Sequence, residues 1–330
     1  MGETANIAEV AKKITKDIFR HFKWHKHPLE DENFSCTNEE HKTDSGKQKA
    51  NHPTDVVLSY QDPYLGTRVH MLFDLKSYAS DSISNSKLRL ALKSLALSTQ
   101  CANESQEWRL KFGVITSEPH EVRGLLFVHN HDNGYQHCFY DQLKKVNTRT
   151  LPIARGNVLH YLGPNDIQRL YSIGNDLIRL RSDHELPEDY TFYYPDLVLR
   201  RRNGEVWDQA ATIESMAGPF MIIKHKPTDK VRSGYVIYYN KAGDCPEEFE
   251  YLIDCFSRFQ MLESEELIRI RVACENANSS LKSHFNIAAK KYAKVWGFDE
   301  TRSEILEAIE VERITAVTSN YNPGDLGWRA

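Results

Sequence analysis

The sequence predicts an α/β (α+β) protein of two domains, and three observations support this fold class. Some segments carry apolar residues every three to four positions, which indicates helices, and others alternate apolar with polar residues, which indicates strands. The two kinds of segment interleave along the whole chain, as they do in sheets covered by helices. The length of 330 residues suits two domains. We place them at residues 1–150 and 151–330, because Pro and Gly interrupt regular structure between residues 150 and 165; Gly218 marks a second candidate boundary.

The predicted elements of the first domain begin with a helix over residues 6–24, whose apolar residues share one face. A short strand is expected at residues 33–38. Residues 55–60 and 67–78 are predicted strands joined by turn chemistry, so they should form an antiparallel hairpin. The remaining elements of this domain are a helix at residues 86–101 and strands at residues 111–116 and 123–129.

The second domain has the same mixture of patterns without a visible repeat. Its predicted helices lie at residues 165–180, 246–262 and 279–296. Its predicted strands lie at residues 190–201, 219–225, 234–239 and 267–274. These elements indicate a second α+β unit.

The charge balance excludes a protein that coats nucleic acid as a polycation. The net charge is −4, from 42 Lys and Arg against 46 Asp and Glu. Residues 1–150 carry 20 basic and 19 acidic side chains, and residues 151–330 carry 22 and 27. Any contact with nucleic acid must therefore use local basic patches, or metal ions that offset the carboxylates.

Neither targeting nor membrane insertion is indicated by the sequence. No apolar stretch approaches the roughly 18 residues that a membrane span needs, and the first residues lack the pattern of a signal peptide. We therefore expect a cytoplasmic protein with no membrane partner. Its cysteines are scattered and form no CxxC pair, which argues against a zinc ribbon and against a disulfide framework. They are Cys36, Cys101, Cys138, Cys245, Cys255 and Cys274, and we expect reduced, structural thiols.

The strongest chemical signal is the segment Phe73-Asp74-Leu75-Lys76 in a predicted strand. Alternation along a strand places Asp74 and Lys76 on one face, together with His70 and Leu72, and Phe73 and Leu75 on the other. A carboxylate and an ammonium that emerge together from an apolar strand are costly unless a metal, a substrate phosphate or each other compensates them. The alternative is a surface hairpin with an ordinary salt bridge, because charge pairs on strands are common.

A second carboxylate belongs to the same place. Asp55 opens the strand before, and a hairpin brings the start of its first strand beside the end of its second, so Asp55 and Asp74 should be neighbours. Two close carboxylates suit a hard divalent cation such as Mg²⁺. Beside that cation, Lys76 could orient a water or neutralise charge on a phosphate. The group predicts metal-dependent hydrolysis of phosphodiesters.

Asp55, followed by Asp74-Leu75-Lys76 on the next strand with helices before and after, resembles the core of the PD-(D/E)xK (restriction-endonuclease-like) nuclease superfamily. The resemblance covers roughly residues 5–130, and Pro53-Thr54-Asp55 replaces the Pro-Asp pair of the family. It implies a mixed sheet flanked by helices. It also implies that Asp55 and Asp74 bind Mg²⁺, with Mn²⁺ as a substitute, that the Leu75 carbonyl is a further ligand, and that Lys76 assists the attacking water.

By this resemblance the protein is an endonuclease with DNA as substrate in preference to RNA, and restriction or antiviral defence is the expected setting. A noncatalytic binding or regulatory protein on a nuclease-like scaffold is the alternative. A further acidic ligand from the first helix, whose candidates are Glu3, Glu9 and Asp17, is left unassigned.

Other groups of residues are weaker candidates. Pro195-Asp196 is followed by no acid-x-lysine, and Glu40-His41-Lys42 lies in polar surroundings. His129 and His131 could ligate a metal, or simply end a strand. Two basic clusters could contact phosphates; they contain Arg200, Arg201 and Arg202, and Lys224 and Lys226. We expect the second domain to serve recognition, homodimerisation or a protein partner.

Overall fold

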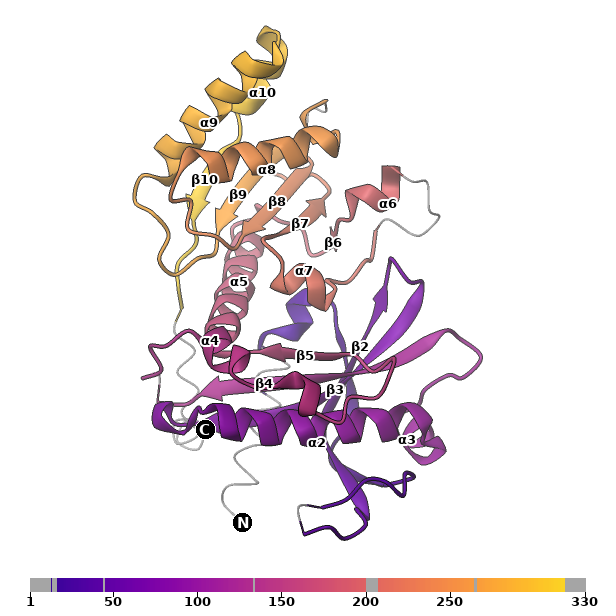
Figure 1. Ribbon diagram of the computed structural model, residues 1–330. Helices are drawn as coiled ribbons and strands as arrows, with labels where there is room; N and C mark the ends of the chain where they lie inside the picture. Colours follow the sequence, from indigo (N-terminus) through magenta and orange to yellow (C-terminus); the bar gives the residue numbers. More distant parts are fainter. Residues whose placement is uncertain are drawn as a thin grey trace, which may run out of the picture. The chain divides into compact units, whose positions relative to one another are not determined.

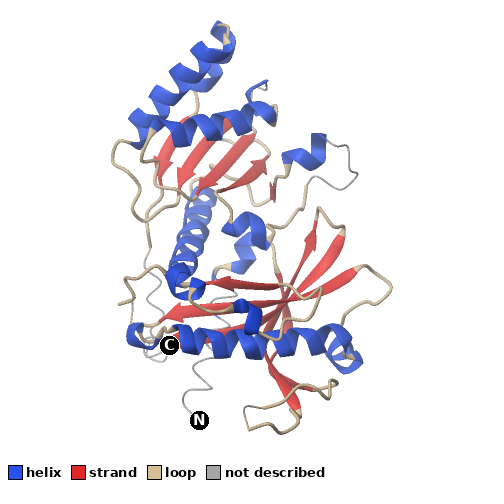
Figure 2. Cartoon of the chain, in the orientation of Figure 1, coloured by secondary structure: helices blue, strands red, loops and turns tan. Residues whose placement is uncertain are grey.

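The computed structural model describes residues 13, 17–43, 45–132, 134–199, 207–263 and 266–317. The chain divides into two compact units between Gln168 and Arg169, within helix α5 (Pro164–Ser182). In the described residues each unit holds one five-stranded sheet, and helices flank both sheets (Figure 1 and Figure 2). The α+β class predicted from the sequence is confirmed.

The first sheet has the strand order β1-β2-β3-β4-β5. Its strands are β1 (His25–Ser35), β2 (Asn51–Asp62), β3 (Thr67–Tyr78), β4 (His120–Asn130) and β5 (Leu159–Leu162). Strands β1 and β3 both pair antiparallel with β2, β4 then pairs parallel with β3, and β5 pairs parallel with β4. This is a mixed sheet, and β5 extends it beyond residue 150.

The β2–β3 hairpin forms where the turn chemistry predicts it. The Asp62 carboxylate accepts hydrogen bonds from the backbone N–H groups of Tyr64 (2.9 Å) and Leu65 (3.1 Å). Gly66 adopts a φ of 63°, which favours glycine. The ladder then runs in register from Asp62 opposite Thr67 to Val56 opposite Phe73.

Helix α2 (Asn85–Glu104) covers one face of this sheet. Ser84 caps it by accepting a hydrogen bond from the Lys87 N–H. Its apolar side packs on Leu72 of β3, so Leu72 and the neighbouring His70 are buried. Residues 69–73 of β3 are buried, whereas Asp74 and Lys76 near the end of the strand are partly exposed.

An aromatic cluster covers the opposite face. Trp24 stacks on Tyr60, Phe19 meets Phe73 edge to face, and Phe127 lies beside both phenylalanines. Phe19 belongs to the 3-10 helix η1 (Phe19–Phe22). Of the helix predicted over residues 6–24, residues 6–12 and 14–16 lie outside the described part of the chain. Both faces of the central strands are thus buried, as parallel pairing requires.

Two sequence predictions in this unit need correction. The strand expected at residues 111–116 is absent: helix α3 (Gln106–Lys111) ends there and a turn follows. The apolar residues Phe112 and Val114 of this segment are nevertheless buried in the core. Their burial explains why the sequence pattern indicated a strand. The strand expected at residues 33–38 is the end of the longer β1. The first part of β1 is mostly polar, so the sequence pattern does not indicate a strand there. The short elements are η2 (Ser80–Ser82), α4 (Phe139–Lys144) and η3 (Thr148–Thr150).

The second unit contains the sheet β10-β9-β8-β7-β6. Its strands are β6 (Tyr190–Phe192), β7 (Phe220–His225), β8 (Gly234–Tyr239), β9 (Leu267–Val272) and β10 (Glu310–Arg313). Besides α5, its helices are α6 (Pro195–Leu199), α7 (Ile213–Ala217), α8 (Pro246–Arg258), η4 (Met261–Glu263), α9 (Leu281–Trp296) and α10 (Glu300–Glu307). The extended segment expected over residues 190–201 stops at Phe192, and α6 follows.

The two sheets share one topology. In each sheet three strands pair antiparallel in chain order, and a fourth and a fifth strand then add in parallel at the side of the third. A helix connects the third strand to the fourth in both units. The second unit therefore repeats the architecture of the first, although the sequence shows no repeat.

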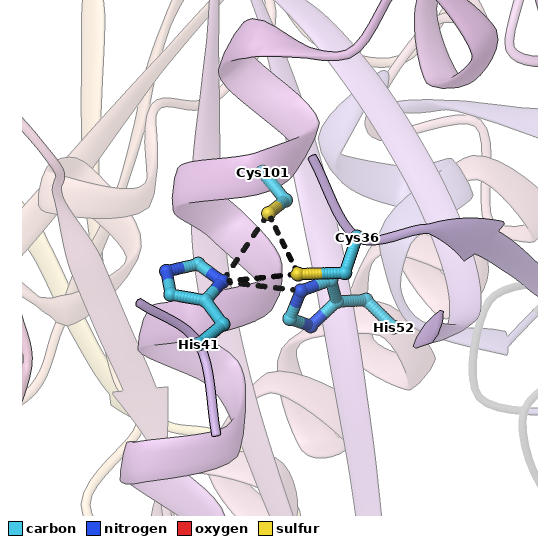
Figure 3. A group of neighbouring side chains, drawn as sticks. All are labelled: Cys36, His41, His52 and Cys101. Carbon is cyan, nitrogen blue, oxygen red and sulfur yellow. Dashed lines mark hydrogen bonds between the residues drawn. The ribbon is translucent and has the colours of Figure 1, made fainter. Parts of the chain in front are cut away.

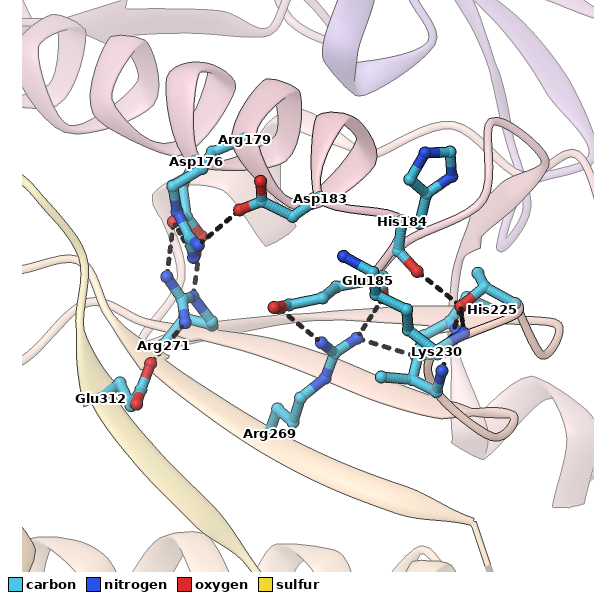
Figure 4. Close-up of polar contacts among 12 residues, drawn as sticks. Asp176, Arg179, Asp183, His184, Glu185, His225, Lys230, Arg269, Arg271 and Glu312 are labelled. Atoms are coloured by element: carbon cyan, nitrogen blue, oxygen red, sulfur yellow. Dashed lines mark hydrogen bonds and ion pairs between the residues drawn. The ribbon is translucent and has the colours of Figure 1, made fainter.

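A buried charge network joins α5 to the second sheet (Figure 4). Asp176 of α5 accepts two hydrogen bonds from Arg271 of β9 and a third, of 2.9 Å, from the Tyr238 hydroxyl. Nearby, Arg269 donates to the Glu185 carbonyl oxygen (2.8 Å) and lies 3.1 Å from His225 Nε2. The buried charges of Asp176 and Arg271 thus compensate each other, as burial of an ion requires. Across the described residues, no helix is both long and apolar enough to cross a membrane.

Candidate active site

Asp55 and Asp74 lie next to each other at the end of the β2–β3 ladder. The last pair of that ladder is Val56 opposite Phe73, so Asp55 precedes one member and Asp74 follows the other. The Leu75 N–H donates a hydrogen bond of 2.6 Å to Asp55 Oδ2, and the Lys76 ammonium is paired with Asp74 Oδ1. The structure therefore brings together the residues that the motif predicts.

Asp55 lies in a partly buried place beside a second carboxylate. Burial and, next, the negative charge of Asp74 raise the pKa of Asp55 to about 6, although the hydrogen bond from the Leu75 N–H and the charge of Lys76 act to lower it. A cation placed between the oxygens of the two carboxylates would stabilise the ionised form of Asp55. Hard oxygen donors of this kind fit Mg²⁺ or Mn²⁺.

Lys76 remains an ammonium at this site. Burial alone would lower its pKa, but the charge and hydrogen bond of Asp74, together with the charge of Asp55, outweigh burial, so the pKa lies above its ordinary value. Its side chain is 33% exposed while that of Asp74 is 14% exposed. A fixed positive charge thus lies at the solvent side of the carboxylate pair, where it can meet an incoming anion.

A third carboxylate, which the sequence analysis missed, comes from β1. Asp31 lies between Glu30 and Glu32, which pair with Val56 and Thr54, so it faces Asp55 across the β1–β2 ladder. Its φ of 52° is unusual for a residue other than glycine, and its charge also raises the pKa of Asp55. Strand pairing, and not sequence distance, places it there. Of the acids left open in the first helix, Glu3 and Glu9 lie outside the described residues.

The exits of β3 and β4 are tied together beside the site. Asp132 accepts a hydrogen bond of 2.9 Å from the Ser80 N–H and one of 2.7 Å from the Asn130 side-chain amide. The same amide donates to the Tyr78 carbonyl oxygen (3.0 Å). The Ser80 hydroxyl also donates to the Asp132 carboxylate, and this bond, followed by the one from the Ser80 N–H, holds the pKa of Asp132 below its usual range. Asp132 is therefore a loop-organising residue. His131 Nδ1 lies 3.2 Å from the Ser77 hydroxyl.

The structure describes only part of the basic residues that the sequence predicts at phosphates. Arg200, Arg201 and Arg202 lie outside the described residues. Lys224 of β7 forms an ion pair of 3.0 Å with Glu266, and its ammonium also lies over the Tyr193 and Tyr235 rings. Lys226 pairs with Asp189 at 2.9 Å. Both lysines are therefore engaged within the second unit, and a role at phosphates stays a prediction.

The second sheet lacks the carboxylate pair at the corresponding place. Its β7–β8 ladder ends at Phe220 opposite Tyr239, and the next residues are Pro219 and Asn240. None of these four described residues carries a carboxylate. The Asn240 N–H donates instead to the Pro219 carbonyl oxygen, at 2.8 Å. The two units thus share a topology but not a metal-binding donor set at this position.

The family comparison agrees with the geometry. A family model described as the GAPS4 protein PD-(D/E)XK nuclease domain matches residues 1–166. The chain belongs to this family. Its match ends inside α5, close to the division between the two units. The resemblance read from Asp55, Asp74 and Lys76 is thereby confirmed at the level of the family and of the restriction-endonuclease-like fold. No curated protein and no solved structure matches the chain.

Membership supports a coarse functional statement. The first unit is a PD-(D/E)XK nuclease domain, a class that acts on nucleic acid and usually uses divalent metal ions.

Proposed function

We propose that the first unit is a Mg²⁺-dependent endonuclease that hydrolyses phosphodiester bonds of DNA in preference to RNA. The observation that carries this proposal is the neighbouring placement of Asp55 and Asp74 with Lys76 paired beside them. An ordinary surface salt bridge would not need the second, partly buried carboxylate. Membership of the PD-(D/E)XK family supports the same reading.

Each residue has a distinct role in this proposal. Asp55 and Asp74 hold the cation, with the Leu75 carbonyl oxygen as a further ligand. A bound Mg²⁺ supplies a Lewis acid and lowers the pKa of water. The hydrogen bond from the Leu75 N–H fixes the orientation of the Asp55 carboxylate. Lys76 orients the attacking water and neutralises charge that develops on the phosphate.

The test compares cleavage of supercoiled plasmid, single-stranded DNA and RNA with Mg²⁺, with Mn²⁺ and with EDTA. Metal-dependent nicking of DNA that Asp74→Ala abolishes is the expected result. Equal activity in EDTA, or in the Asp74→Ala variant, would contradict the assignment. Cleavage of RNA alone would keep the metal site and change the substrate.

We further propose that the second unit is noncatalytic and serves target recognition, self-association or a protein partner. The basis is the absence of carboxylates at Pro219, Phe220, Tyr239 and Asn240. Restriction or antiviral defence in the cytoplasm is the setting we propose for a DNA-cleaving protein of this kind. Measuring plaque formation in cells that carry the wild type or Asp74→Ala tests that setting.

A further inference from the structure

We propose that the first unit holds a structural zinc ion bound by Cys36, His41, His52 and Cys101, at a site separate from the carboxylate pair. These residues come from three segments. Cys36 and His41 lie in the connection between β1 and β2, His52 lies in β2, and Cys101 lies in α2. Figure 3 shows the four side chains converging. One donor atom from each lies within 4.8 Å of the others.

Four of the six distances among the donor atoms match those of a tetrahedron around zinc, and all six are within 4.8 Å. Bonds of about 2.3 Å to sulfur and about 2.05 Å to nitrogen place two sulfurs about 3.8 Å apart, two nitrogens about 3.3 Å apart and unlike atoms about 3.6 Å apart. The two Sγ atoms are 3.8 Å apart and His41 Nδ1 is 3.3 Å from His52 Nε2. His41 Nδ1 lies 3.5 Å from Cys36 Sγ and 3.3 Å from Cys101 Sγ.

Hydrogen bonding alone does not account for this arrangement. His41 Nδ1 has three polar neighbours, the two sulfurs and His52 Nε2, all within 3.5 Å. A ring nitrogen offers one proton or one lone pair, so it satisfies one partner. Its other nitrogen, Nε2, lies 3.0 Å from Gln100 Oε1. That acceptor needs a proton on Nε2, which leaves the lone pair of Nδ1 pointing at the cluster, as a metal ligand requires.

Residues around the cluster provide the supporting contacts that zinc sites need. The outer nitrogen of each histidine has a partner, Gln100 for His41 and the Ser98 hydroxyl, at 3.3 Å, for His52. Such contacts fix the tautomer and orientation of a ligating imidazole. The Thr37 hydroxyl donates to Cys101 Sγ at 3.8 Å, as suits a thiolate. Three of the four ligands are buried and Cys36 is partly exposed, so the site is closed and structural, not catalytic.

Zinc at this place would fasten the start of β2 to α2. His52 precedes Asp55 by three residues on the same strand, so the metal would anchor the strand that carries the first carboxylate. The site is not recognisable in the sequence because its ligands are 5, 11 and 49 residues apart and form no CxxC pair. Only the Cys36 to His41 pair has a spacing typical of zinc ligands.

The test starts with the wild-type full chain, purified without chelator and without added metal. Elemental analysis by mass spectrometry should find about one zinc per chain. Cobalt substitution should give the visible absorption of tetrahedral, thiolate-ligated Co²⁺. A wild-type protein that folds but carries no zinc and takes up no cobalt would overturn the proposal. A disulfide between Cys36 and Cys101, revealed by a thiol count in denaturant, would also overturn it.

Variants separate this site from the other groups. Cys36→Ala should lose the zinc, whereas the matched control Cys138→Ala, at an exposed cysteine, should keep it. Asp74→Ala should also keep it, because the carboxylate site is separate. Zinc lost equally from Cys36→Ala and Cys138→Ala, or retained by both, would contradict the assignment. The wild-type zinc content decides the question even where Cys101→Ala fails to fold.

Discussion

The Leu75 backbone N–H donates a hydrogen bond of 2.6 Å to Asp55 Oδ2. This contact joins the two strands of the hairpin beyond the last ladder pair and fixes the first carboxylate beside Asp74. It leaves Asp55 close to a like charge in a partly buried place, so the pKa of Asp55 rises to about 6. Replacing an acid of this pair should therefore impair cleavage while leaving the fold intact.

Asp74→Ala should abolish metal-dependent cleavage and leave the fold intact. Removing one of two repelling carboxylates does not destabilise the metal-free protein, but the cation loses a ligand. Plasmid nicking and thermal melting measure the two effects, with Asp229→Ala at an exposed position as the control. Normal cleavage by Asp74→Ala would exclude this residue as a metal ligand.

Lys76→Met should lower the single-turnover cleavage rate by about 10²- to 10⁴-fold with little change in metal affinity. The ammonium is paired with Asp74 and partly exposed, so it can reach a water or a phosphate. Titration of Mn²⁺ measures metal affinity and rapid quench measures the rate. A lowered melting temperature with an unchanged rate would instead identify a structural ion pair.

The stability of the metal-free protein should fall as pH rises from about 4 to about 6. The pKa of Asp55 is raised from 3.8 to about 6 on folding, so the folded state holds its proton more tightly than the unfolded state, and this contribution is lost as the proton leaves. The change is roughly 3 kcal/mol at most. Urea unfolding of wild type and Asp55→Asn checks it, since the variant should lack this pH dependence.

Metal affinity should have the opposite pH dependence. Below pH 6 a proton competes with the cation for Asp55, so the Mg²⁺ concentration needed for cleavage should rise about tenfold per pH unit. Calorimetric titration of Mn²⁺ at pH 5 and pH 7.5 measures this directly. Equal affinity at both pH values would show that Asp55 does not bind the metal.

Asp176→Ala should destabilise the second unit by about 3–5 kcal/mol, because it leaves the buried Arg271 without its main partner. Lys144→Ala is the matched control, since the pair of Lys144 with Asp141 is exposed and is worth about 0–1 kcal/mol. Urea unfolding compares the two variants. Equal losses of stability in the two variants would show that the buried ion pair contributes no more to stability than the exposed one.

Replacing Arg200, Arg201 and Arg202 with Ala should weaken DNA binding for every sequence. Each lost phosphate contact should flatten the slope of log affinity against log salt by about 0.9. Lys224→Ala is the contrast, because its ammonium already pairs with Glu266. Fluorescence anisotropy at several salt concentrations measures the slopes. An unchanged slope in the triple variant would point to a second unit that binds protein or another copy of the chain.

The sequence by itself determined the local parts of this protein. The bounds predicted for β3 and β8, residues 67–78 and 234–239, are those of the structure, because alternation and turn residues act within a few positions. The same alternation placed Asp74 and Lys76 on one face, and the hairpin placed Asp55 beside them. Each of these inferences needs only neighbours along the chain or across one turn.

Only the tertiary structure decided what depends on packing between distant segments. Strand pairing brought Asp31 opposite Asp55, and α2 carried Cys101 to Cys36, 65 positions away. The shared topology of the two sheets cannot be recognised in the sequence either. Many different sets of apolar residues can form the core of the same arrangement of strands. Helix docking and sheet pairing set these distances, and no local pattern records which segments will meet.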